Sequence, residues 1–269
     1  MINIMFNRII FYYQTFTSLQ PIIDKKIVTH IHLSAIHFGI ENNKPYIHLN
    51  DFDPENSKFD KLWEEIRLCQ NNNIKIILMV GGAGGAFETM FSNYKVYYNL
   101  LKNTIIKYNL DGIDLDVEEI TNLDNIKMLI SDLNNDFGND FIMSMAPVQY
   151  AIEEDSSGMG GFKYKDLFNS EEGKHINYFN VQCYYDFQSV NFENMIKNGY
   201  PIEKLVFGMI YSQNLETCLE EMKKFKNINN EIGGMFIWEY CYAENNNPLK
   251  WCQEVSNVLN QKSSFCTLC

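Results

Sequence analysis

The amino-acid sequence predicts a single α/β domain of the (β/α)8 class, a closed barrel of parallel strands surrounded by helices. The length of 269 residues fits one such barrel, which typically takes about 250 residues. Short apolar runs alternate along the chain with longer amphipathic stretches, as in repeated βα units. Several of the short runs are almost continuously apolar, which is typical of parallel strands covered on both faces. An open, doubly wound sheet is the alternative arrangement of the same elements.

Eight apolar runs are expected to form the barrel strands, and crossovers of roughly 20–40 residues separate them. In chain order these runs are residues 8–14, 30–38, 75–82, 112–119, 141–148, 178–187, 204–211 and 233–240. The stretches between them place apolar side chains at helical spacing, with charged residues on the opposite face. This pattern is clearest in residues 59–70, 97–108, 123–137 and 215–225.

The elements define one domain. The barrel is expected to occupy residues 1–260, and residues 261–269 are expected to form a loose C-terminal tail. Only residues 212–232 separate the last two strands, which leaves room for one helix and its loops. No linker, low-complexity block or appended binding module interrupts this organisation.

The composition is that of an acidic globular protein. Hydrophobic residues make up 46% and charged residues 21% of the chain, which excludes wholesale disorder. The net charge of −12 disfavours nucleic acids and anionic membranes as partners, because both bind basic surfaces. No apolar run reaches the ~18 residues of a membrane span, and the N-terminus lacks the features of a signal peptide. We expect a monomer that is cytoplasmic or released without a conventional signal.

Metal and disulfide motifs are weak. The seven cysteines are scattered, and the terminal CxxC of Cys266 and Cys269 offers only two of the four ligands of a zinc site, so a free-thiol tail is expected. His30, His32 and His37 partly alternate, which hints at zinc, but no fourth ligand is evident. We therefore expect neither a metal nor a cofactor.

The stretch from Asp111 to Glu119 carries the most chemistry. Side chains alternate between the faces of a strand, so Asp114, Asp116 and Glu118 share one face at steps of roughly 6.8 Å. Burying unpaired carboxylates costs several kcal/mol each, so a purely structural core would not keep such a row. At the C-terminal end of a barrel strand, this row indicates catalysis.

Elementary electrostatics predicts different protonation states, and therefore different roles, for the three carboxyl groups of the row. Neighbouring carboxylates do not all ionise cheaply, so Asp114 and Asp116 can share a proton. Glu118 is expected nearest the rim, where it can stay protonated as a general acid. A hard-cation site is one alternative, although Leu115 and Val117 interrupt the loop pattern that a calcium site needs. A solvated acidic loop is the other.

The DxxDxDxE pattern of Asp111, Asp114, Asp116 and Glu118 resembles the signature of glycoside hydrolase family 18, which contains chitinases and endo-β-N-acetylglucosaminidases. The resemblance extends from Arg8 to about Val258 and so covers nearly the whole chain. Weaker matching motifs lie on the third, fifth, sixth and eighth expected strands, at residues 80–83, 143–147, 182–185 and 233–240.

Within this family the sequence looks most similar to fungal-type, single-domain endo-β-N-acetylglucosaminidases. The residues that carry this likeness are 48–51, 79–83, 111–119, 146–148, 155–157 and 238–240. The resemblance implies a TIM barrel without the chitinase-insertion domain, which in larger relatives falls between the seventh and eighth strands. The substrate groove should therefore be shallow and open.

The resemblance also implies a mechanism, namely retaining hydrolysis assisted by the substrate. Glu118 would protonate the leaving glycosidic oxygen while the 2-acetamido carbonyl of the substrate attacks the anomeric carbon. Asp116 would hold the acetamide N–H and balance its developing charge, and Asp114 would share a proton with Asp116. Tyr184 would hydrogen-bond the acetamide oxygen and fix its angle of attack.

Further residues are assigned to the site by the same resemblance. Trp238 would form the apolar floor under the sugar at the cleaved bond, and Gln182 would contact that sugar. Gly81 and Gly82 would permit tight packing or a bulge beside the site. Asp111 would be structural, at the start of the strand. The full set expected to bind substrate is Trp238, Gln182, Gly82, Met145, Tyr185 and Glu239.

Three functions follow as hypotheses. The first is an endo-β-N-acetylglucosaminidase that cleaves GlcNAc-β-1,4-GlcNAc in N-glycan cores, and the second is a chitinase with the same chemistry. The third is a non-catalytic carbohydrate-binding barrel, because some relatives are lectins that have lost the catalytic Glu, which is kept here as Glu118. Many chitinases carry Ser in place of Met79 and a small polar residue in place of Tyr185, so the substrate stays open. The expected partner is a GlcNAc-containing oligosaccharide or glycoprotein glycan.

Overall fold

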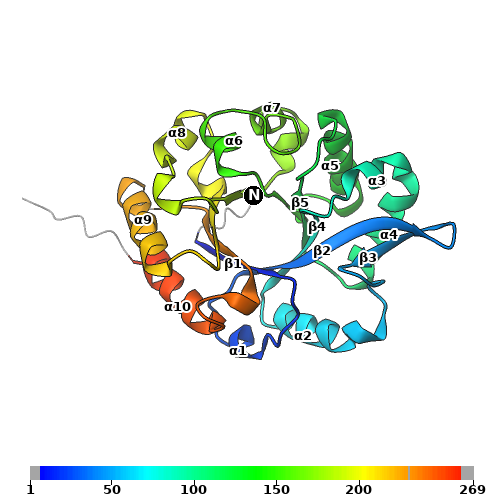
Figure 1. Cartoon of the computed structure of the whole chain (residues 1–269), viewed down its shortest axis with the longest axis horizontal. Coiled ribbons are helices and arrows are strands. Elements are labelled where there is room, and N and C mark those ends of the chain that lie inside the picture. Colours follow the sequence, from blue (N-terminus) through cyan, green and yellow to red (C-terminus); the bar gives the residue numbers. More distant parts are fainter. Residues whose placement is uncertain (1–6, 230, 262–269) are drawn as a thin grey trace, which may run out of the picture.

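The computed structural model of the chain describes residues 7–229 and 231–261. Its centre is a closed barrel of eight parallel strands, because β1 pairs with both β2 and β9 (Figure 1). This confirms the (β/α)8 class. The barrel strands are β1 (Arg8–Tyr13), β2 (His30–Glu41), β4 (Lys75–Gly81), β5 (Gly112–Asp116), β6 (Ile142–Met145), β7 (Tyr178–Gln182), β8 (Leu205–Ile210) and β9 (Gly234–Trp238).

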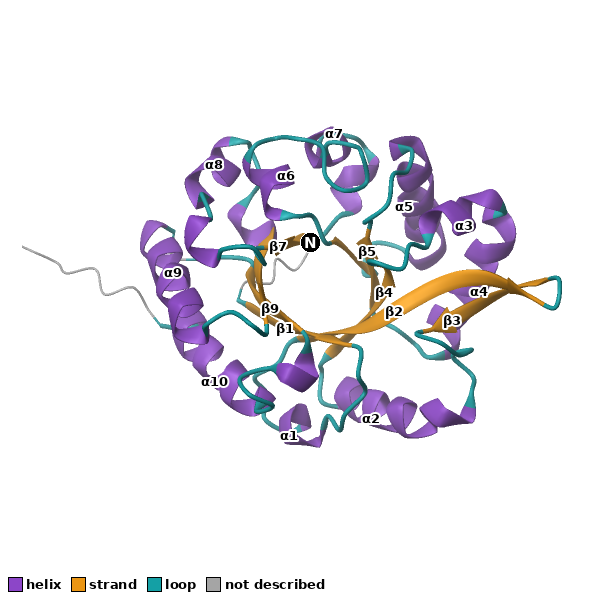
Figure 2. Ribbon diagram, in the orientation of Figure 1, coloured by secondary structure: helices purple, strands orange, loops and turns teal. Residues whose placement is uncertain are grey.

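Helices form a ring around the barrel (Figure 2). The longer ones lie where the amphipathic pattern is strongest, and α5 begins and ends where that pattern does. Asn122 caps α5 by accepting a hydrogen bond from the backbone N–H of Asp124. The helices are α1 (Gln20–Ile23), α2 (Asp60–Asn71), α3 (Phe87–Ser92), α4 (Tyr94–Lys107), α5 (Leu123–Phe137), α6 (Gln149–Glu153), α7 (Tyr164–Phe168), α8 (Phe192–Lys197), α9 (Leu215–Ile228) and α10 (Pro248–Leu259).

One strand lies outside the expected pattern. β3 (Lys44–Leu49) runs antiparallel to the second half of β2, and the two form a hairpin that projects from the barrel (Figure 1). Asn42 and Asn43 make its turn with positive φ angles of 50° and 59°. The expected second strand ended at Phe38, so the hairpin was not foreseen.

The two faces of the barrel strands have different roles. Ile113 and Leu115 of β5 point outward and belong to the large hydrophobic cluster between the sheet and the helices. Asp114 and Asp116 point the other way, into the barrel, in agreement with the predicted alternation. Inside the barrel a smaller apolar cluster is formed by Ile10, Tyr12, Ala35, Met79, Tyr178, Val206 and Phe236.

The connection between β8 and β9 holds one helix, α9, in the residues described there, which agrees with a barrel that carries no inserted domain. In the part of the chain that the structure covers, no helix has the length and apolar character to cross a membrane. The expected loose tail at 261–269, with its CxxC of Cys266 and Cys269, lies outside the described residues apart from residue 261.

Candidate active site

The acidic row begins with a structural aspartate. Asp111 lies directly before β5, and its carboxylate accepts hydrogen bonds from Lys75 Nζ at 2.7 Å and from the backbone N–H of Ile76 at 2.9 Å. These contacts tie the start of β5 to β4. Asp111 therefore aligns the two strands and lies away from the mouth of the barrel, as expected.

Asp114 lies inside the barrel with none of its surface exposed. Ser144 Oγ and Asn180 Nδ2 donate to one carboxylate oxygen, at 2.6 and 3.2 Å, and Tyr12 Oη donates to the other at 2.7 Å. Burial alone would raise the pKa of Asp114. The neighbouring His32 and the hydrogen bonds outweigh burial, so the pKa is lowered from its ordinary value. Asp114 is therefore an ionised carboxylate in a shell of fixed donors.

The pKa of Asp116 is shifted in the opposite direction to that of Asp114. Asp116 is buried at the end of β5, and its hydrogen-bond donor is the side-chain amide of Gln182, at 3.1 Å. Burial raises the pKa of Asp116 well above its ordinary range, and the nearby Glu118 and Asp114 raise it further. The opposite directions of the two pKa shifts favour Asp116 over Asp114 as the holder of the proton that the two aspartates are expected to share.

Gln182 connects the two outer carboxyl groups. Its Nε2 lies 3.1 Å from Asp116 Oδ1, 3.3 Å from Glu118 Oε1 and 3.0 Å from the carbonyl oxygen of Ala146. Glu118 lies two residues beyond the end of β5 and is half-buried. The end of β7 thus holds the outermost carboxyl group of the row at the mouth of the barrel.

These groups surround a cavity of about 230 Å³ at the C-terminal ends of the strands. Tyr184 and Trp238 bring aromatic surface to the cavity from the segments after β7 and at the end of β9. Burial and the carboxylates of Asp116 and Glu118 raise the pKa of the Tyr184 hydroxyl, which therefore stays protonated and able to donate. The lining residues are Tyr12, Gly82, Ala83, Asp116, Glu118, Ala146, Gln182, Tyr184, Ile210 and Trp238.

Comparison of the sequence with protein families gives a match to "Glycosyl hydrolases family 18" over residues 8–227. The chain belongs to glycoside hydrolase family 18. Among solved structures, a fungal endo-β-N-acetylglucosaminidase of family 18 is 30% identical, with a TM-score of 0.86, over 94% of this chain and 98% of its own. No curated protein matches the sequence.

Two chitinases are also similar. Chitinase ChiC from Aspergillus fumigatus is 28% identical, with a TM-score of 0.81, and the match covers 93% of this chain and 99% of that one. A family 18 chitinase from Pseudoalteromonas aurantia shares the fold at 16% identity, with a TM-score of 0.74 over 94% of this chain and 100% of its own. The family 18 assignment thus agrees with the resemblance that the DxxDxDxE motif suggested.

Two glycines shape the wall of the cavity beside Asp116. Gly81 and Gly82 have φ angles of +99° and +83°, and the backbone N–H of Gly82 donates to the carbonyl oxygen of Asp116 at 2.9 Å. A Cβ at position 81 would lie 2.3 Å from that oxygen. Glycine at 81 is therefore required by close backbone packing, and Gly82 itself lines the cavity.

Met145 does not reach the cavity. It was expected to bind substrate, but its side chain is fully buried in the cluster between the barrel and the helices. The alternation of β6 explains this, because Ser144 points inward to Asp114 and Ala146 lines the cavity, so residue 145 points outward. The expectation for Met145 is corrected: it is a core residue.

Glu239 is hydrogen-bonded to the loop after β1 and does not line the cavity. Its carboxylate is buried, and it accepts hydrogen bonds from the backbone N–H groups of Gln14 and Thr15 at 2.9 and 3.2 Å and from the Thr15 hydroxyl. These contacts fix the loop after β1 against the end of β9. The expected contact of Glu239 with substrate is therefore replaced by a structural role next to Trp238.

Tyr185 lies beside the cavity. Its side chain is 99% exposed, and it lines a mostly apolar hollow of about 370 Å³ together with Tyr150 and Val148. Gln182 and Tyr184 line both this hollow and the catalytic cavity, so the two are adjacent. The structure therefore leaves open the expected contact of Tyr185 with substrate and adds Tyr150 beside it.

Other residues at the site were not foreseen. Tyr12 points into the barrel from β1, where the alternation of residues 8–14 could have indicated it. Glu119 follows Glu118, and its carboxylate accepts hydrogen bonds from the backbone N–H groups of Ala86 and Phe87 at the start of α3. This contact fixes the loop that carries Gly82, and its sequence signal is only an acidic residue after the motif.

The histidines do not form a metal site. His32 points into the barrel, His30 contacts Thr29, and the ring of His37 stacks on that of His48 at 5.5 Å. Within residues 7–229 and 231–261, no group of three or more His, Cys, Asp or Glu side chains is arranged to hold a metal ion.

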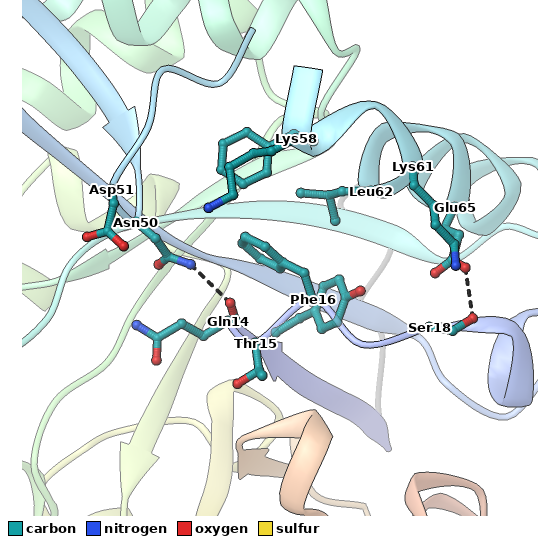
Figure 3. A pocket seen from close by; sticks show the side chains of 12 residues that line it. Gln14, Thr15, Phe16, Ser18, Asn50, Asp51, Lys58, Lys61, Leu62 and Glu65 are labelled. Atoms are coloured by element: carbon teal, nitrogen blue, oxygen red, sulfur yellow. Dashed lines mark hydrogen bonds between the residues drawn. The ribbon is translucent and has the colours of Figure 1, made fainter. Parts of the chain in front are cut away.

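A separate pocket of about 330 Å³ lies between the loop after β1 and the N-terminal part of α2 (Figure 3). Asn50 donates to the carbonyl oxygen of Gln14 on one side of it, and Ser18 donates to Glu65 on the other, at 3.0 and 2.8 Å. None of the three carboxyl groups of the acidic row lines this pocket. Asp116 and Glu118 line the other cavity, which is therefore the candidate active site.

Proposed function

We propose that this family 18 protein is a retaining, substrate-assisted glycosidase that cleaves GlcNAc-β-1,4-GlcNAc linkages as an endo-β-N-acetylglucosaminidase on N-glycan cores. The observation that carries the proposal is the arrangement of Asp116 and Glu118. Both carboxyl groups lie within hydrogen-bond distance of the same Gln182 nitrogen and face a cavity walled by Tyr184 and Trp238.

The first step breaks the glycosidic bond. Glu118 donates its proton to the leaving oxygen, and the bond between that oxygen and the anomeric carbon breaks. The carbonyl oxygen of the substrate's own 2-acetamido group forms a new bond to the anomeric carbon, giving an oxazolinium ion. In the second step, water attacks the same carbon and gives a proton to Glu118, while the bond between the anomeric carbon and the acetamido oxygen breaks and the acetamido group is restored. Two inversions at this carbon retain the configuration.

The other residues act on the acetamido group. Asp116 receives the acetamide N–H and compensates the positive charge that develops on the oxazolinium ion. The Tyr184 hydroxyl donates to the acetamide oxygen and holds it below the anomeric carbon. Trp238 offers its ring face to the apolar face of the pyranose. Each role uses a residue that lines the cavity.

The choice of N-glycan over chitin draws support from the comparisons. The fungal endo-β-N-acetylglucosaminidase is 30% identical to the chain over nearly its whole length. The chitinase alternative also has support, because the enzyme from Aspergillus fumigatus is 28% identical over a similar span. The chemistry at the cleaved bond is common to both, so the substrate assay has to separate them.

A side-by-side product analysis tests the proposal. The protein is incubated with a high-mannose glycoprotein and with chitohexaose, and products are followed by mass spectrometry. We expect a free glycan and a protein that keeps one GlcNAc per site, with kcat/KM at least about tenfold higher on the glycoprotein. Faster cleavage of chitohexaose would establish the chitinase alternative, and binding without product would favour a non-catalytic barrel.

A second measurement tests substrate assistance. Replacing the substrate's N-acetyl group by N-trifluoroacetyl withdraws electrons from the attacking carbonyl oxygen. The rate should therefore fall strongly, and proton NMR should show the β-anomer as the first product. An unchanged rate, or the α-anomer first, would contradict the mechanism.

A further inference from the structure

A histidine lies beneath the acidic row without a role in the mechanism above. His32 points into the barrel from β2 and is fully buried. Its Nε2 lies 3.0 Å from the hydroxyl of Tyr178 on β7, and its Nδ1 lies 3.4 Å from Oδ2 of Asp114. The latter contact is longer than an ordinary hydrogen bond, and among the described residues Nδ1 has no hydrogen-bond partner. The imidazole therefore bridges Tyr178 and Asp114.

The partners of the ring determine its tautomer. Asp114 is ionised and only accepts, so the ring nitrogen that faces it must carry the hydrogen. The other nitrogen then accepts, and the Tyr178 hydroxyl is its donor. With the opposite tautomer, the lone pair of Nδ1 would point at a carboxylate oxygen, which is repulsive. Tyr178 thus orients the His32 ring so that its Nδ1–H is directed at Asp114.

His32 completes the shell around Asp114. Ser144 and Asn180 donate to one carboxylate oxygen and Tyr12 donates to the other, which His32 Nδ1 also faces at 3.4 Å. Because the carboxylate is buried, each lost donor makes its charged form less stable. If Asp114 lost its charge by taking up a proton, that proton would lie in the closed interior of the barrel, away from the cavity.

We propose that His32 is a positioning residue for hydrolysis: it holds the negative charge on Asp114 and so keeps the shared proton on Asp116, on the cavity side of the row. From there the proton is available to Glu118, which shares the Gln182 nitrogen with Asp116. The inference rests on the proposed function, because it names a residue that serves that reaction from outside the cavity.

Few groups near this bridge compete for the proton. Burial raises the pKa of Tyr12 and Tyr178 and lowers the pKa of His30, so all three stay neutral across the pH range of an assay. The neighbouring barrel strands face Asp114 with Met79 of β4 and Ser144 of β6, neither of which titrates in this range. The guanidinium of Arg8 lies 4.5 Å from the ring centroid of Tyr178 and is the cation next to the bridge. The other ionisable groups around it are Tyr12, His30, Asp116, Glu118, Tyr164, Tyr178 and Tyr184.

Steady-state kinetics on a GlcNAc-β-1,4-GlcNAc substrate test the proposal. His32→Leu removes the N–H and keeps most of the volume, and we expect kcat to fall by about tenfold to a hundredfold with KM nearly unchanged. Because Asp114 then binds a proton more readily, the acid limb of the kcat profile should move to higher pH. His32→Asn restores a donor and should recover most of kcat.

Two further variants separate positioning from packing. His30→Leu changes a buried histidine on the same strand that contacts Thr29 rather than Asp114, so its pH profile should match wild type. Tyr178→Phe removes the donor to Nε2, and it should shift the profile in the same direction as His32→Leu. In the double variant, Tyr178→Phe should add little, because the bridge is already broken.

An NMR titration of the aspartates tests the role of His32 independently of enzyme activity. Carbon-13 NMR of labelled aspartate side chains, assigned with Asp114→Asn and Asp116→Asn, should show Asp114 ionised throughout the stable pH range of wild type. In His32→Leu, Asp114 should titrate at higher pH. An unchanged titration and an unchanged pH profile would overturn the role of His32. A wild type that cleaves no GlcNAc substrate would instead overturn the proposed function and leave the titration as the test.

Discussion

The side-chain nitrogen of Gln182 lies 3.3 Å from Oε1 of Glu118. The same nitrogen lies within hydrogen-bond distance of Asp116 and of the carbonyl oxygen of Ala146, and an amide nitrogen has only two hydrogens for these three acceptors. Glu118, the proposed general acid, is therefore held by a donor that it shares with Asp116, the residue proposed to bind the acetamido group. When substrate moves one of the two carboxyl groups, the hydrogen bonds of the other change with it.

The first prediction concerns this shared donor. Gln182→Met keeps the length of the side chain but removes both hydrogens, so Glu118 and Asp116 lose the group that aligns them. We expect kcat to fall by about tenfold or more, with a smaller change in KM. Gln188→Met is the matched control, because Gln188 is exposed on the loop after β7. Equal kinetics of the two variants would contradict the aligning role.

The second prediction tests Glu118 as the acid. Glu118→Gln removes the transferable proton, and kcat on a natural glycan should fall by roughly 10²–10⁴-fold. A substrate with an acidic phenol as leaving group needs little protonation, so the same variant should lose much less activity on it. Equal losses on both substrates, measured by steady-state kinetics, would assign Glu118 a role other than proton donation.

The third prediction concerns stability and pH. Burial raises the pKa of Asp116, so the folded state binds this proton more tightly than the unfolded chain does. The contribution of Asp116 to the free energy of unfolding is present below its ordinary pKa of 3.8 and is lost as pH rises through the folded-state pKa. Asn does not ionise in either state. Asp116→Asn should therefore gain stability over wild type as the pH rises from 4.5 to neutral.

Thermal unfolding measures this gain. At neutral pH the melting temperature of Asp116→Asn should exceed that of wild type by at least about 2 °C, although the variant should be nearly inactive. Asp140→Asn is the control, because Asp140 is exposed before β6 and should show no such pH dependence. A difference that is constant with pH would argue against a proton held on Asp116.

Local sequence patterns predicted the barrel and the acidic row for a physical reason. Alternation along β5 decides that Asp114 and Asp116 share a face, and a buried face of a parallel strand is easily recognised. The same alternation, applied to β6, would have directed Met145 away from the cavity, but the family motif was followed instead. Periodicity and motif therefore disagreed at this residue, and the periodicity was right.

Other features depend on contacts between distant parts of the chain. Glu239 binds Thr15, more than two hundred residues earlier, and His32 meets Asp114 only because the barrel closes. Local patterns in a single sequence do not show which distant residues contact each other. These contacts form only when the barrel closes.

The last prediction tests the structural role of Glu239. In Glu239→Leu the backbone N–H groups of the half-buried Gln14 and the exposed Thr15 lose their charged acceptor, and each lost hydrogen bond to a charged group costs about 1.5–3 kcal/mol. The melting temperature should therefore fall by roughly 5–12 °C. Thr15→Val removes only the hydroxyl donor and should cost less. Because the Glu239 side chain does not line the cavity, KM of the folded enzyme at 20 °C should change by less than about threefold. An unchanged melting temperature with a strongly raised KM would instead restore the expectation that Glu239 contacts substrate.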